Sequence, residues 1–148
     1  MAKKQTKKPA PAAQQVGTTR CLGGVCNPER SQGLKAPAPT GTHNLVTLTG
    51  PGVFLAAEVS KQGGTNDITF VVLDIDGRNV TNISFAALAN QGLTQHNPYG
   101  LAVFHSAALK TVTIGFPSPL FYRQSLRLSV TVNEPNVAQI VANVIHGA

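Results

Sequence analysis

The sequence predicts an all-β protein, an antiparallel β-sandwich of about eight strands preceded by an extended or disordered N-terminal arm. Apolar and polar residues alternate through much of the chain after residue 44, which is the period of half-buried strands. Turn-forming Gly, Pro, Asn and Asp interrupt this pattern at short intervals. All eight aromatic residues lie in the same region, and a length of 148 residues suits one core.

The expected strands follow from apolar residues at every second position. In 125–133, Leu126, Leu128, Val130 and Val132 alternate with polar residues and so share one face. The sequence Asp76-Gly77 favours the positive φ angles of a two-residue hairpin turn between 68–75 and 78–85. The full set of expected strands is 44–49, 53–60, 68–75, 78–85, 101–105, 110–116, 125–133 and 137–145.

Four segments show a less regular pattern than these strands. Residues 137–145 fit helical spacing as well, but their many Val and Ile residues favour a strand. Residues 86–90 could form one helical turn. Residues 91–99 and 117–124 are polar or contain Pro, so we expect them to be loops and the variable or binding surfaces.

The net charge of +6 lies in the first 44 residues. That segment holds seven Lys and Arg residues against one Glu, whereas 45–148 carry five basic and five acidic residues. It has no aromatic residue and is rich in Pro and Gly, so it cannot bury enough apolar surface to order itself. The sequence therefore predicts a basic Pro/Gly/Ala-rich arm over 1–42 and a β-sandwich domain over 43–148.

The motifs of common enzymes are missing from the sequence. It contains no Gly-rich phosphate loop, no Gly-x-Ser-x-Gly turn and no His-Glu-x-x-His pair. His96 and His105 could meet Asp67 or Asp74, but a lone His in a loop more often packs or is solvated. Asp74 to Gly77 suits a hairpin turn better than a calcium loop. We therefore expect no catalytic residues, no metal and no cofactor.

The sequence also lacks the apolar segments that membranes and export require. No apolar run approaches the ~20 residues that span a bilayer. The Lys-rich start has no apolar segment of the secretory kind. We expect neither membrane association nor export.

Cys21 and Cys26 enclose a short loop with two glycines. Two thiols cannot complete a tetrahedral zinc site, so metal binding is not expected. Three states stay open: two free thiols in a reducing cytosol, a bridge within the loop, or bridges between subunits.

Four lysines, Lys3, Lys4, Lys7 and Lys8, form a basic cluster at the start of the arm. Such a cluster can neutralise phosphates, which makes nucleic acid a possible partner, with weak and salt-sensitive binding. The alternative is a solvating tail. The rest of the chain is neutral, so the folded domain is not expected to bind nucleic acid.

Parts of the sequence resemble known virion proteins. The Lys cluster followed by PAPAA (9–13) resembles the basic arms that precede β-sandwich domains in many viral coat proteins. The expected strands resemble the small β-rich virion structural proteins of tailed bacteriophages in texture, through VFLAAEVS (53–60), DIDGRNV (74–80) and LRLSVTVN (126–133). This resemblance implies a subunit that decorates a capsid or belongs to a collar or tail, made in the host cytoplasm and located in the virion.

An assembly role implies other virion proteins as partners and a homo-oligomer, for which we expect a trimer. If the arm ties subunits together, its few apolar residues, Val16, Leu22, Val25 and Leu34, would dock on a neighbour. Two alternatives stay open. One is a coat protein whose arm binds the genome, and the other is a carbohydrate-binding or adhesion module, for which Tyr99 and Tyr122 would be the exposed aromatics.

Overall fold

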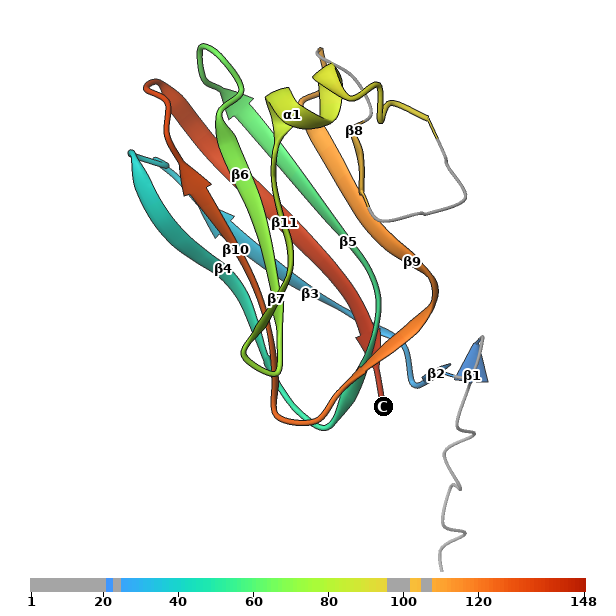
Figure 1. Ribbon diagram of the computed structural model, residues 1–148. Helices are drawn as coiled ribbons and strands as arrows, with labels where there is room; N and C mark the ends of the chain where they lie inside the picture. The colour runs from blue at the N-terminus through green and yellow to red at the C-terminus, as the bar shows by residue number, and fades with distance from the viewer. Residues whose placement is uncertain (1–20, 23–24, 96–101, 105–107) are drawn as a thin grey trace, which may run out of the picture.

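The computed structural model describes residues 21–22, 25–95, 102–104 and 108–148 and shows two facing antiparallel β-sheets (Figure 1). One sheet has the strand order β4 (Gly41–Thr49), β10 (Ser125–Val132), β6 (Thr69–Ile75) and β7 (Arg78–Ser84). The other has the order β3 (Glu29–Lys35), β11 (Val137–Gly147), β5 (Gly52–Gly63), β9 (Thr111–Tyr122) and β8 (Ala102–Phe104). The expected β-sandwich is confirmed.

The core lies between the two sheets, where the alternating side chains point inward. Leu126, Leu128, Val130 and Val132 of β10 are all fully buried, as their spacing predicted. Val112 of β9 is buried in the same way from the opposite sheet. Each such side chain contributes about 1.5–3 kcal/mol to stability relative to exposure.

The local features at the end of β6 and after β7 are also confirmed. Asp76 and Gly77 have φ angles of 51° and 75°, as a two-residue hairpin turn between β6 and β7 requires. The short helix α1 (Phe85–Asn90) occupies the segment where one helical turn was expected. Ser84 caps it, since its side chain accepts a hydrogen bond of 3.1 Å from the backbone N–H of Ala87. No helix in the described ranges is long and apolar enough to cross a membrane.

The predicted domain boundary at residue 42 is wrong. Residues 29–35 form β3, an edge strand of the five-stranded sheet that pairs with β11 over seven residues. Gly33 of β3 packs so tightly on the backbone of Leu45 in β4 that a Cβ there would overlap the Leu45 carbonyl oxygen. Ser31 is 2.8 Å from the Nε2 atom of His146. The folded domain therefore includes much of the segment that was expected to be an arm.

A short ladder links residues 21–26 to the C-terminal end of β11. In this ladder β1 (Cys21–Leu22) pairs with β2 (Val25–Cys26), with Cys21 opposite Cys26. Cys26 is disulfide-bonded, which agrees with the bridge within the loop. The backbone of Cys26 exchanges two hydrogen bonds with Ala148, at 3.0 and 3.1 Å. This segment is thus held by the domain itself.

The expected loop over 117–124 is mostly strand. β9 continues to Tyr122, and residues 120–122 pair with residues 52–54 of β5. The two prolines, Pro117 and Pro119, lie in a stretch for which no cross-strand register is formed with β5, so their missing N–H groups remove no bond from that ladder. Of the other expected loop, 91–99, residues 96–99 lie outside the described ranges.

Candidate interaction surface

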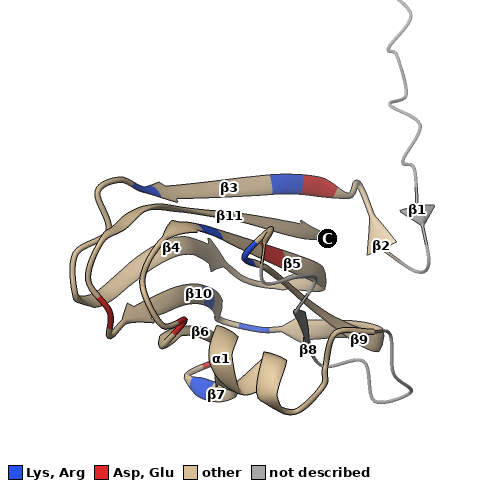
Figure 2. Cartoon of the chain, turned by 90° about the horizontal axis from the view of Figure 1, so that it is seen from above, with Lys and Arg blue, Asp and Glu red and all other residues tan. Residues whose placement is uncertain are grey.

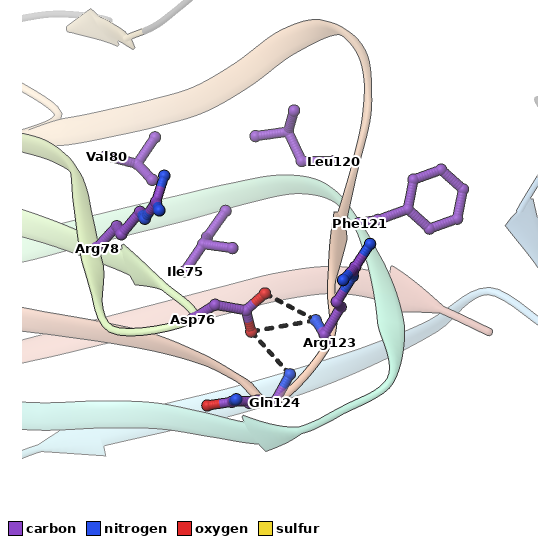
Figure 3. A pocket seen from close by; sticks show the side chains of 8 residues that line it. All are labelled: Ile75, Asp76, Arg78, Val80, Leu120, Phe121, Arg123 and Gln124. Carbon is purple, nitrogen blue, oxygen red and sulfur yellow. Dashed lines mark hydrogen bonds between the residues drawn. The ribbon is translucent and has the colours of Figure 1, made fainter.

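A hollow of about 560 Å³ lies at the end of the sandwich where β6 turns into β7 and β9 ends (Figure 3). The hairpin turn between β6 and β7, the turn between β9 and β10, and the last residues of β9 form it. Its lining consists of Ile75, Asp76, Arg78, Val80, Leu120, Phe121, Arg123 and Gln124.

Asp76 fixes the floor of this hollow by joining the two turns. Its carboxylate accepts hydrogen bonds from the backbone N–H groups of Arg123, Gln124 and Ser125, at distances of 2.7–3.1 Å. Figure 3 shows those from Arg123 and Gln124. These bonds, that from Arg123 first, lower the pKa of Asp76 below its ordinary value. The carboxylate of Asp76 thus holds the turn between β9 and β10 against the turn between β6 and β7.

Phe121 stands out from the rim of the hollow into solvent. The residue is 77% exposed, the largest exposed fraction among the large apolar residues that the structure describes as exposed. Figure 3 shows its ring pointing away from the other side chains of the hollow. Val80 of β7 and Leu120 line the hollow beside it. An exposed aromatic ring beside aliphatic side chains is a common composition for a protein-binding site.

Two arginines flank the apolar part of the hollow. Arg78 begins β7 and Arg123 follows β9, and neither guanidinium forms an ion pair with any described residue. Asp76 supplies one negative charge against these two positive charges, and its charge interacts with that of Arg123. The lining of the hollow therefore carries a small net positive charge beside exposed apolar surface.

A second depression of about 500 Å³ lies on the other side of Phe121. Pro51, Gly52, Val53 and Ala148 line it together with the end of β9. Tyr122 packs over Gly52 so closely that a Cβ at that glycine would overlap the phenol. Tyr122 is therefore buried, which corrects the expectation that it would be an exposed aromatic. Phe121 separates the two depressions.

The opposite end of the sandwich holds a buried ion pair. Lys61, near the end of β5, lies 2.5 Å from Oε1 of Glu134 in the loop between β10 and β11. Neither side chain is exposed to solvent. Lys61 also contacts Asp67 at 2.7 Å, and Asp67 contacts Lys110 at 2.5 Å. The four charges compensate one another.

Glu134 has partners for both carboxylate oxygens. Oε1 also accepts a hydrogen bond of 2.6 Å from the hydroxyl of Thr69, and Oε2 accepts three from the backbone N–H groups of Thr65, Asn66 and Asp67. Burial raises the pKa of Glu134, but the bonds from Lys61, Thr69 and Asn66 outweigh it and lower the pKa to about 2. This carboxylate is a structural element of the fold.

The lowered pKa predicts loss of stability in acid. The Glu134 pKa falls from 4.5 in the unfolded chain to about 2 on folding, so its contribution is complete above pH 4.5 and disappears as the pH falls to about 2. We expect the free energy of unfolding to drop by roughly 3 kcal/mol over this range from Glu134 alone. Urea unfolding at a series of pH values measures it. For a Glu134→Gln variant, the free energy of unfolding should fall less steeply below pH 4.5. A fall as steep as that of the wild type would contradict the assignment of this pH dependence to Glu134.

The structure places the residues singled out in the sequence at different sites. Val25 was expected to dock on a neighbour, but it is completely buried and packs against Gly147 of its own β11. Leu34 is 63% exposed on β3. For Cys21 and Leu22 only the backbone of β1 is described. Lys3, Lys4, Lys7, Lys8, Val16, Tyr99, His96 and His105 lie outside the described ranges.

The sequence predicted only some of the residues that line the hollow as part of a binding surface. Residues 117–124 were expected to form a binding surface, and Phe121 and Arg123 lie there. Arg78 and Val80 were assigned to a strand, with nothing to indicate that they would face this segment. Among the described residues, no group of three or more His, Cys, Asp or Glu side chains is arranged to hold a metal ion.

Comparisons with known proteins give little further information. No protein-family model matches the sequence, and no curated protein matches it. The crystal structure of FlhE superposes with a TM-score of 0.41 at 11% sequence identity, covering 82% of this chain and 98% of that one. A likeness of this size carries no argument about function.

Proposed function

We propose that this chain is a structural subunit of a virion, of the capsid-decorating, collar or tail kind, and that it docks on another protein of the particle through the hollow beside Phe121. The observation that carries the docking proposal is the Phe121 side chain, 77% exposed between two depressions. The assignment to a virion rests on the resemblance of the strand sequences to small phage virion proteins.

The composition of the hollow supports a protein as its ligand. Aromatic and arginine side chains dominate the binding energy of many protein interfaces. Arg78 and Arg123 form no ion pair with any described residue, so a complementary surface would bring carboxylates to them. The hydrogen bonds from the Asp76 carboxylate to the turn between β9 and β10, which we call the Asp76 clamp, hold both turns in place before binding. Little conformational entropy is therefore lost at these turns on docking.

The matched test is to introduce Phe121→Ser and, separately, Leu109→Ser into particles produced in the native host. Leu109 is similarly exposed, at 68%, and does not line the hollow. Loss of a dominant interface aromatic costs about 2 kcal/mol or more, roughly 30-fold in affinity. We therefore expect Phe121→Ser to lower the copy number of the chain in purified particles at least tenfold, and Leu109→Ser to leave it unchanged. Quantitative mass spectrometry of the particles measures this.

The outcomes separate the two parts of the proposal. If the wild-type chain is absent from purified particles, it is not a virion subunit. If Phe121→Ser is incorporated like the wild type, the hollow is not the docking site. Both variants should keep the wild-type free energy of unfolding within about 0.5 kcal/mol, because the replaced side chains are exposed.

A further inference from the structure

The outer face of the five-stranded sheet is a second surface without a described partner. Figure 2 shows β3, β11 and β5 side by side on one side of the molecule. Arg30 of β3 lies opposite Ile145 of β11, and two residues along β11 Asn143 lies opposite Glu58 of β5. Their side chains point away from the core, because Val144, between Ile145 and Asn143, is fully buried. We call these four residues and their neighbours the Asn143 face.

The centre of this face is concave and contains an unsatisfied acceptor. A depression of about 240 Å³ lies over Asn143, with Arg30, Glu58 and Ile145 in its lining. The Oδ1 atom of Asn143 is shielded from solvent and has no hydrogen-bond partner among the described residues. Buried polar atoms without a partner are uncommon in folded proteins, so the hydrogen bonding at the centre of this face is incomplete within the described residues.

The charges of the Asn143 face are self-complementary. Arg30 and Glu58 are exposed, carry opposite signs and form no ion pair with any described residue. They lie on the two strands that flank β11, diagonally across Asn143 and Ile145. A two-fold axis between them would bring Arg30 of each copy to Glu58 of the other, so the same pair would form twice.

The rest of the face suits contact between copies. Leu34 is 63% exposed and lies opposite Val141, which also points outward. The side-chain hydroxyls of Ser60 and Thr111 form a hydrogen bond of 3.0 Å with each other, so they need no partner from another molecule. Apolar and satisfied polar groups surround one positive and one negative charge, which is the arrangement of an interface that recognises its own copy.

We propose that two copies of this chain pair through the Asn143 face as a two-fold dimer. This inference goes beyond the proposed function, because it concerns a different surface from the hollow beside Phe121. The dimer takes the place of the trimer that we expected from the sequence. The depression over Asn143 is filled by the second copy.

The test compares Arg30→Glu, Glu58→Arg and the double variant Arg30→Glu/Glu58→Arg with the wild type. We expect sedimentation equilibrium of the full chain to show a dimer for the wild type. Each single variant places like charges opposite each other twice and should raise the dissociation constant at least about tenfold. The double variant reverses both pairs and should return it to within about threefold of the wild type. All measurements are made with and without reductant, since a thiol-linked dimer would give the same mass.

Several results would overturn the proposal. They are a wild-type monomer or trimer, a dimer that disappears with reductant, single variants that dimerise like the wild type, or a double variant that stays as weak as the singles. Thermal unfolding of each variant shows whether it folds, and exposed charges at these positions should change stability little. None of these results depends on Phe121, so this proposal and the proposed function can fail separately.

Discussion

Replacing Lys61 by Met should lower the free energy of unfolding by about 3–5 kcal/mol, because the carboxylate of Glu134 then remains buried without its cation. Both side chains of this pair are fully shielded from solvent. Urea unfolding near neutral pH measures the change. A Lys61→Met variant as stable as the wild type would mean that the Glu134 carboxylate is held by its backbone donors and Thr69 alone.

Lys110 provides the matched control. It also contacts Asp67, but its side chain is 29% exposed, so solvent screens the interaction. Lys110→Met should cost under about 1 kcal/mol. A double Lys61→Met/Glu134→Gln variant should recover part of the loss, because no unpaired charge remains buried. Recovery would show that the cost of the single variant lies in the isolated charge and not in lost packing.

Deleting residues 1–40 should prevent stable folding, whereas deleting residues 1–20 should not. The longer deletion removes β3, with its seven paired residues, and the buried side chains of Val25 and Ala38. It also leaves the backbone of β11 as an unpaired sheet edge. We expect a loss of more than about 4 kcal/mol, or an aggregated product.

Circular dichroism and urea unfolding of the two truncated chains distinguish the interpretations. The sequence-based boundary at residue 42 predicts that both shortened chains fold equally well. The structure predicts wild-type stability only for the chain that retains β3. A stable 41–148 fragment would show that the folded domain begins near residue 42, as the sequence predicted, and that β3 is not needed for folding.

The difference between β3 and the other long strands explains what the sequence could predict. β10 was predictable because it has four large apolar residues at alternate positions, a pattern that fits a strand with one buried face and few other structures. β3 has the sequence ERSQGLK, and its buried position is a glycine while its leucine faces solvent. An edge strand that packs through its backbone leaves no apolar period to detect.

The candidate site depends on contacts between distant parts of the chain. Asp76 reaches Arg123 across 47 positions in the sequence, and no local pattern indicates that these two turns meet. The position of Lys61 gave a weak indication that it would be buried. It follows Val59 by two residues in a strand, so its side chain points to the same face as the fully buried Val59. Its partner Glu134 lies 73 positions away and could not be identified without the fold.

The clamp at Asp76 also has a mechanical consequence. The turn that it grips joins β9 of the five-stranded sheet to β10 of the four-stranded sheet, and Asp76 itself lies between β6 and β7. A force applied at Phe121 therefore pulls on β9 directly, on β10 through the connecting turn, and on β6 through the hydrogen bonds of Asp76. The tension is shared between both layers, and the turn between β9 and β10 cannot be pulled away from the turn between β6 and β7 without breaking several hydrogen bonds loaded in parallel.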